Sequence, residues 1–364
     1  MITNLQLLRG LAALGVVVYH TNLHINGVHS ELMGVAIFFV ISGFIMVHIT
    51  RETDEDFLLR RLIRIVPLYW ILAVAAFLWF GLGFANPPYT WPLWANFIAH
   101  NPVGLLRWFA AQAFSISTPD SALALVRSLT FWPTAQDPMP ILAVGWTLNI
   151  EMFFYLLFAL ALLGGRAGAP LLSGMVLVAL FFLNKSGISQ GKVLGTFGHN
   201  YVIYFVFGMA IYFLWRKIEP KIQTHRRTAI AVAAAALASW PVICFTPLPF
   251  SEIQFLLLPP LVVLSLLALH SANIRLTSRL LIDFGGASYA LYLVHIPVVE
   301  TLRATSAAYP LLELATPIGA TVAACVSSLL AMLIYYKLEM PLLRYLQSRF
   351  RSAAPVAAPV PTGV

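Results

Sequence analysis

Long apolar runs, separated by short polar segments, fill almost the whole chain. At least ten of them have about 17–22 residues, the length that an α-helix needs to cross a hydrocarbon layer of roughly 30 Å. The runs are continuously apolar and lack the period-two alternation of outer-membrane strands. They lie near residues 5–24, 31–50, 66–85, 144–164, 168–184, 199–215, 228–246, 253–271, 281–300 and 315–336. The pattern predicts an all-α, polytopic membrane protein with about ten transmembrane helices.

The composition agrees with this interpretation. Of the 364 residues, 60% are hydrophobic and 10% are charged, whereas about 25% of the residues of a soluble domain are charged. The first run starts close to Met1 without a basic leader or a small-residue cleavage site, so we expect it to stay in the protein as a helix. Cys244 and Cys325 fall inside separate runs, where packing is their expected use.

Basic residues are distributed unevenly between the loops, and this predicts the orientation. With the N-terminus in the cytoplasm, 16 of the 22 lysines and arginines fall on the cytoplasmic side and 5 on the outer side. Cytoplasmic loops of membrane proteins carry such an excess. We therefore expect both termini in the cytoplasm, in a bacterial-type inner (plasma) membrane. The net charge of +8 reflects this topology and attraction to lipid headgroups, and no nucleic-acid partner is predicted.

Two segments stand outside the ten runs. Residues 96–116 are apolar enough for a further crossing, and a single crossing there would invert the downstream topology, whereas a hairpin of two would preserve it. We expect an interfacial or re-entrant element. Residues 346–364 are first basic and then rich in proline and alanine, a composition typical of a disordered tail. The expected division is a membrane domain at 1–345 and a cytoplasmic tail at 346–364.

Arg9 and His20 are ionisable residues inside the first run, and such residues mark functional sites in membrane proteins by default. They are eleven positions apart, which places them about 20° from eclipsed on one helix face, with an axial separation of about 16 Å. Each also has a structural interpretation, because Arg9 can snorkel to headgroups and His20 can be a satisfied core histidine. Their shared face favours a common cavity, with Arg9 near the cytoplasm.

Glu151 stands about eight residues inside the fourth run, at a depth similar to that of His20 from the same side. A carboxylate beside an imidazole fixes its tautomer, as in acyl-transfer sites. The sequence therefore predicts His20 and Glu151 as the catalytic pair. The alternative is a protonated acid that is hydrogen-bonded within the bundle. Asn149 serves either structure or acceptor binding.

Arg60, Arg61 and Arg64 precede Pro67, which is expected to open the third transmembrane helix. Arg61 and Arg64 are three positions apart and share a helix face. The three arginines are either positive-inside anchors or a phosphate clamp, since guanidinium groups offer forked donors to phosphate oxygens.

Small and hydroxylated residues mark two further runs. Ser42 with Gly43 allows close helix contact. Tyr289 and His295, in the segment FGGASYALYLVH, are expected to make interhelical hydrogen bonds, and His295 is a candidate for contact with an acceptor. No metal site is predicted.

Five segments together resemble a known family. They are LLRGLAALGVVVYH (7–20), GVAIFFVISGFIM (34–46), RRLIRIVPLYW (60–70), GWTLNIEMFFY (145–155) and GGASYALYLVH (285–295). In this order they resemble the acyltransferase-3 family of integral membrane acyltransferases, in its exopolysaccharide-production (ExoZ-like) branch. In that family the pair that corresponds to Arg9 and His20 is needed for activity, and the resemblance extends to Arg61, Arg64 and Glu151.

The resemblance implies an enzyme that moves an acyl group, most commonly acetyl, from cytoplasmic acyl-CoA to a hydroxyl of an exported or lipid-linked polysaccharide. Arg9, Arg61 and Arg64, with Arg60 beside them, are expected to hold the phosphates of acyl-CoA, which is a donor substrate and not a permanently bound cofactor. His20 is expected to deprotonate the acceptor hydroxyl. The implied partners are acyl-CoA, the glycan or lipid-linked oligosaccharide, membrane lipids and a polysaccharide biosynthesis complex.

Two alternatives stay open. A transporter of lipid-linked sugars would also carry ten helices and intramembrane charges, but it would need no CoA. Within the enzymes, a succinyl- or longer-acyl transferase acting on glucan or lipid would carry the same motifs.

Overall fold

The computed structural model describes residues 2–51, 56–81, 100–101, 103–104, 119–131, 140–187, 191–246, 251–306, 309 and 312–350. Within these ranges the regular structure is helical. The helices are α1 (Thr3–His20), α2 (Gly34–Thr50), α3 (Phe57–Gly81), α6 (Pro119–Leu129), α7 (Gly145–Leu162), α8 (Ala169–Lys185), α9 (Lys192–Phe197), α10 (Val202–Thr224), α11 (Arg226–Cys244), α12 (Ser251–Ser271), α13 (Arg279–Gly286), α14 (Ser288–Ser306), α15 (Pro317–Ile334), the π-helical turn η2 (Tyr335–Glu339) and α16 (Met340–Phe350).

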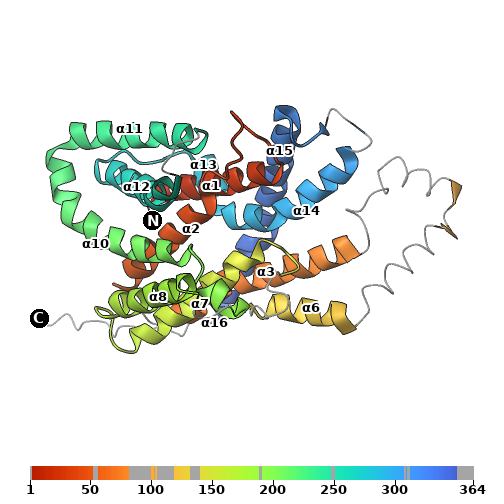
Figure 1. The fold of residues 1–364 in the computed structure, drawn as a ribbon, viewed down its shortest axis with the longest axis horizontal. Coiled ribbons are helices and arrows are strands. Elements are labelled where there is room, and N and C mark those ends of the chain that lie inside the picture. The colour runs from red at the N-terminus through yellow and green to blue at the C-terminus, as the bar shows by residue number, and fades with distance from the viewer. Residues whose placement is uncertain are drawn as a thin grey trace, which may run out of the picture.

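Helices α1 and α2 lie in the middle of the molecule, between α11 and α12 on one side and α7 and α8 on the other (Figure 1). Glycines allow their close packing. A Cβ atom added at Gly43 would lie 2.2 Å from the carbonyl oxygen of Phe205, and one at Gly208 would lie 2.1 Å from that of Val40. Helices α2 and α10 therefore touch backbone to backbone, as small residues permit in membrane bundles.

Hydrogen bonds define the two ends of the bundle. At one end, which we call the His20 end, Arg303 on α14 donates to the carbonyl oxygen of His20 at 2.7 Å. At the opposite end, which we call the Asn4 end, the side chain of Asn4 bonds the main chain of Ile274 and Leu276, each at 2.8 Å. Helices α1 and α14 thus run in the same direction, from the Asn4 end to the His20 end.

Several helices are long and apolar enough to cross a membrane. By length and hydropathy, five segments among the described residues qualify, namely Phe57–Gly81, Gly145–Leu162, Val193–Thr224, Arg226–Cys244 and Pro317–Phe350. The pair α13 and α14, bent by 63°, makes a sixth if it is counted as one span. Three shorter apolar helices are Gly34–Thr50, Ala169–Lys185 and Phe255–Ser271. The chain is thus all-helical and multi-pass in character, while the count of ten and the cytoplasmic termini stay predictions.

Element boundaries differ from the prediction where the chain turns. Helix α1 ends at His20, four residues before the expected end, because Thr21 caps it and Asn22 follows with a φ of 62°, the left-handed conformation that ends helices. Helix α3 starts at Phe57 and continues through Pro67, so the arginines lie in the helix and not before it. The run at 281–300 is broken between Gly286 and Ser288.

Two sequence expectations fall largely outside the described residues. Of the segment 96–116, the structure describes 100–101 and 103–104 only. The tail expected from 346 starts within α16, which ends at Phe350, and residues 351–364 are not described.

Candidate active site

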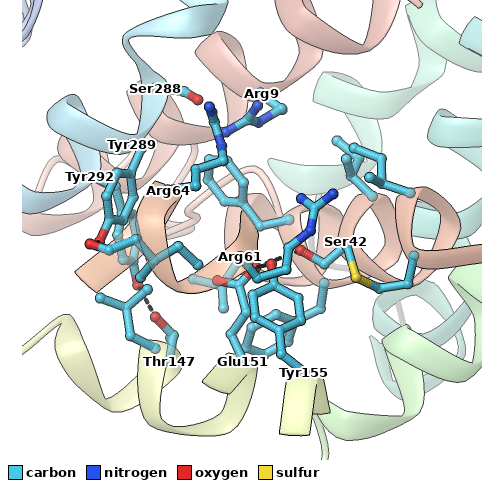
Figure 2. Close-up of a pocket in the computed structure, with 18 residues that line it drawn as sticks. Arg9, Ser42, Arg61, Arg64, Thr147, Glu151, Tyr155, Ser288, Tyr289 and Tyr292 are labelled. Carbon is cyan, nitrogen blue, oxygen red and sulfur yellow. Dashed lines mark hydrogen bonds between the residues drawn. The ribbon is translucent and has the colours of Figure 1, made fainter. Parts of the chain in front are cut away.

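A cavity of about 110 Å³ lies between α1, α2, α3, α7 and α14 (Figure 2). Its wall is apolar on the side of α2, where Phe38, Phe39 and Ile41 contribute. Its polar lining consists of three arginines (Arg9, Arg61 and Arg64), one carboxylate (Glu151) and the hydroxyl groups of Ser42, Thr147, Tyr155, Ser288, Tyr289 and Tyr292. Segments that are far apart in the sequence thus bring their polar residues to one place in an otherwise apolar bundle.

The three arginines of the cavity make no contact with a carboxylate in the part of the chain that the structure describes. Ion pairs within 4.0 Å among the described residues join Arg216 to Glu219, Arg279 to Asp283 and Arg303 to Glu300, and none involves the cavity arginines. Arg9 donates one long hydrogen bond, of 3.4 Å, to Gln6. The buried Nε atom of Arg61 has no hydrogen-bond partner in the described part of the chain. Such a set of donors can hold an anion, phosphate above all.

Arg60 differs from its two neighbours. Its side chain is exposed, and it is not part of the cavity lining. Around the helix Arg64 lies between the other two, about 60° from Arg61 and about 40° from Arg60, so Arg60 is on the flank of Arg64 that points away from Arg61.

Glu151 joins α7 to α2. Its Oε1 atom accepts a hydrogen bond of 2.7 Å from the Ser42 hydroxyl and another from the Tyr155 hydroxyl one turn further along α7. Figure 2 shows the three side chains grouped below Arg61. Ser42 therefore does more than allow close packing. Tyr155 was not singled out from the sequence, although its position four residues after Glu151 places it on the same helix face.

His20 lies elsewhere. It is the last residue of α1 and does not line the cavity. Its Nδ1 atom lies 2.9 Å from the carbonyl oxygen of Val16. A carbonyl can only accept, so Nδ1 carries the hydrogen and Nε2 is left with the lone pair of a base.

The predicted contact between His20 and Glu151 is wrong. The hydrogen bonds of Glu151 go to Ser42 and Tyr155, and that of His20 goes to its own helix. The prediction placed both residues at one depth. Because α1 ends at His20 and not at residue 24, the histidine lies at the end of the bundle, while Glu151 lies six residues inside α7. The backbone of Val16, and not a carboxylate, fixes the tautomer of His20.

The ring of His20 lies next to those of Tyr19, its neighbour in the sequence, and His295 on α14. The two histidine rings have centroids 5.0 Å apart. His295 is fully buried, its Nδ1 atom lies 3.3 Å from the carbonyl oxygen of Leu291, and its Nε2 atom has no partner among the described residues. Tyr292 lies between this histidine and the cavity, with its ring 5.7 Å from His295 and its hydroxyl 2.9 Å from that of Thr147. The histidine pair therefore adjoins the cavity on the side of Tyr292.

The two remaining predicted residues, Tyr289 and Asn149, face different spaces. Tyr289 lines the cavity and donates to the carbonyl oxygen of Ile65 at 2.9 Å. Asn149 faces a different space, an apolar groove of about 660 Å³ between α3, α7 and α16. It is buried there, and its Oδ1 atom has no partner in the described part of the protein.

One ionisable residue near the cavity was missed. Glu339, in the π-helical turn η2, is 1% exposed, and both of its carboxylate oxygens lack a hydrogen-bond partner among the described residues. Arg64 and Arg9 are the cations whose charges act on it. The expected last run ended at residue 336, before Glu339, but α15, η2 and α16 follow one another without a break.

Comparison with known proteins identifies the family. The acyltransferase-3 family, described as an acyltransferase domain, matches residues 2–337. The chain belongs to this family. It is an acyltransferase of groups other than amino-acyl groups, as the sequence resemblance implied. The described residues contain no cluster of three His, Cys, Asp or Glu side chains that could hold a metal ion.

Two relatives place this acyltransferase more closely. It is 31% identical over 316 residues to the exopolysaccharide production protein ExoZ of Rhizobium meliloti (strain 1021), which covers 85% of this chain and 89% of the relative. It is 23% identical over 374 residues to the putative peptidoglycan O-acetyltransferase YrhL of Bacillus subtilis (strain 168), which covers 94% of this chain and 55% of that relative. The first similarity supports the ExoZ-like branch. No solved structure matches the chain.

Proposed function

We propose that this acyltransferase moves an acyl group, acetyl in the first place, from acyl-CoA to a hydroxyl of an exported or lipid-linked polysaccharide. The observation that carries the proposal is the set of three cavity arginines, none of which contacts a carboxylate among the described residues. Helical spacing places Arg9, one of the three, on the same face of α1 as His20. The names of the two relatives, one for exopolysaccharide production and one for peptidoglycan O-acetylation, support a glycan acceptor. The family assignment favours the enzyme over the transporter.

The donor binds at the arginines. Arg9, Arg61 and Arg64 hold the phosphates of CoA, because forked, charge-assisted hydrogen bonds to phosphate oxygens are strong. Arg60 is left out of this role by its position. The pantetheine arm then extends along the side of α1 that meets α14, over the axial distance of about 16 Å from Arg9 to His20.

The chemistry takes place at the histidine pair. The Nε2 atom of His20 accepts the proton of the acceptor hydroxyl as the oxygen attacks the thioester carbon. The carbon–sulfur bond breaks, the new ester is released, and the CoA thiolate takes up the proton from the imidazolium. A positioned base of this kind contributes about 10²–10⁴ in rate. Glu151 acts in the cavity, where its carboxylate holds the hydroxyls of Ser42 and Tyr155 beside the arginines.

The test is acyl transfer by purified protein in nanodiscs. Release of free CoA thiol from acetyl-CoA, succinyl-CoA and a longer acyl-CoA is followed with and without de-O-acetylated polysaccharide. We expect acetyl-CoA to be consumed fastest and the acetyl ester to be recovered on the glycan by mass spectrometry. Faster use of succinyl-CoA would replace acetyl by succinyl, and the absence of thiol release from every donor would reject the proposal.

A further inference from the structure

Three aromatic side chains gather at the His20 end, next to the cavity but not in it. Trp146 is the second residue of α7, and His199 and Tyr201 immediately precede α10. The Trp146 ring centroid lies 5.3 Å from that of His199 and 5.7 Å from that of Tyr201. His199 and Tyr201 stack at 5.2 Å with their planes 4° apart. All three side chains are partly exposed, so a ligand can reach them.

Polar atoms with unused hydrogen-bonding capacity surround these rings. The Tyr201 main-chain N–H donates to Nδ1 of His199 at 3.3 Å, so Nδ1 is an acceptor and the neutral ring carries its hydrogen on Nε2. Glu31 accepts a bond of 3.1 Å from the Tyr201 hydroxyl on Oε1, and Oε2 has no hydrogen bond among the described residues. In the same part of the structure, the indole N–H of Trp146 has none either. The group thus offers two donors, on Trp146 and His199, and one carboxyl acceptor, on Glu31.

An interfacial belt of aromatic residues does not account for this arrangement. Belt side chains place their rings at the headgroups and their polar tips in water. Here the carboxyl group of Glu31, in the segment between α1 and α2, accepts from the Tyr201 hydroxyl, and burial raises the pKa of Glu31 to about 7. Its Oε2 atom, which makes no hydrogen bond among the described residues, is left for a ligand beside the three rings.

The aromatic group adjoins the proposed reaction site. Thr147, next to Trp146 in the sequence, lines the cavity, and so does Phe39, whose ring lies 5.8 Å from that of Tyr201. The main-chain oxygen of Glu31 packs on α1 at Gly15, where an added Cβ atom would lie 2.7 Å from it. Gly15 precedes His20 by about 7.5 Å along the helix axis.

We propose that Trp146, His199, Tyr201 and Glu31 form the subsite that binds a sugar ring of the glycan acceptor. A sugar presents an apolar C–H face that stacks on aromatic rings, and hydroxyls that both donate to Glu31 and accept from Trp146 and His199. A cationic headgroup fits less well, because the two N–H donors would face its positive charge. This inference rests on the proposed function and assigns its acceptor side.

The experiment compares Trp146→Ala and Glu31→Gln with the wild-type protein in nanodiscs. The probe is de-O-acetylated oligosaccharide from the surface polysaccharide of the cell that makes this protein. Glu31→Gln keeps the side-chain shape and an oxygen that accepts from Tyr201, so we expect this variant to fold even if Trp146→Ala does not. Phe182→Ala is the matched control, since it removes an aromatic side chain that is 63% exposed on α8.

We expect each variant to raise the KM for oligosaccharide roughly tenfold, the effect of one lost hydrogen bond or contact. The KM for acetyl-CoA and the slow thiol release to water should not change, and Phe182→Ala should behave as wild type. An unchanged acceptor KM in both variants, or competition by choline instead of oligosaccharide, would overturn the subsite. Wild-type protein that transfers nothing to any glycan would instead reject the proposed function.

Discussion

Replacing Glu151 by glutamine should destabilise the protein through Ser42 and Tyr155, and not through His20. Glutamine keeps the volume but turns a charged acceptor of two hydroxyls into a neutral one. Hydrogen bonds to charged groups contribute about 1.5–3 kcal/mol and neutral ones about 0.5–1.5 kcal/mol. The difference is about 1 kcal/mol for each bond, so Glu151→Gln should lower the free energy of unfolding by about 2 kcal/mol.

Double-mutant cycles locate this loss. Glu151→Gln is combined with Ser42→Ala, with Tyr155→Phe and with His20→Ala, and the free energy of unfolding is measured by titration with SDS in mixed micelles. Residues in contact couple by about 0.5–3 kcal/mol, whereas separated residues are additive within about 0.5 kcal/mol. We expect a coupling of about 1 kcal/mol with Ser42 and with Tyr155, and additivity with His20.

The His20 pair decides between two interpretations of the site. If Glu151 touched the imidazole, as the sequence suggested, His20 and Glu151 would couple as strongly as Ser42 and Glu151. A coupling above 1 kcal/mol for the His20 pair, with none for Ser42, would refute the reasoning from the structure.

Three further predictions address the donor site, the packing and the topology. Arg64→Ala should raise the KM for acetyl-CoA at least tenfold, as expected for a lost charge-assisted bond, and should raise the KM for glycan much less. The control Lys217→Ala, which removes an exposed charge on α10, should change neither KM, and equal rises in both KM values for Arg64→Ala would contradict the donor role. Gly285→Ala, whose Cβ would lie 1.9 Å from a main-chain oxygen of α1, should lower the unfolding free energy by about 3 kcal/mol through overpacking. Gly195→Ala, with nothing within 4 Å of the added Cβ, should lower it by nothing. A cysteine at position 221, in a variant without the native cysteines, should react with an impermeant maleimide only after the cells are opened; labelling in intact cells would invert the predicted orientation.

The sequence predicted best what helical geometry decides locally. Apolar run length indicated the membrane helices, and the spacing of three between Arg61 and Arg64 indicated that they face one space. Both residues line the cavity, together with Arg9 and Glu151 from two other predicted helices. A charged residue inside an apolar run is costly and marks a functional site by default. Charged residues from separate runs can therefore be assigned to one site, although the sequence does not show their contacts.

The contacts between residues of different helices could not be predicted from the sequence, because they depend on where each helix ends. The position of His20 along the bundle depends on where α1 ends. Thr21 and Asn22 end the helix directly after His20, four residues before the end of the apolar run. The pair Thr-Asn was a signal for this end, but the apolar run continues past it. Glu339 depends on a π-helical turn that no periodicity reveals. The acceptor subsite joins Glu31, Trp146 and His199, which lie in three segments with no shared motif.

The central claim is that His20 is the base of acyl transfer from CoA to a glycan. Its most direct test is single-turnover transfer of radiolabelled acetyl from acetyl-CoA to de-O-acetylated oligosaccharide by wild-type and His20→Ala protein in nanodiscs, with acetyl-CoA binding and thermal unfolding measured on the same samples. The account predicts that His20→Ala binds acetyl-CoA and unfolds as wild type does, while its transfer rate falls by about 10²–10⁴. Transfer at the wild-type rate by well-folded His20→Ala protein would contradict it.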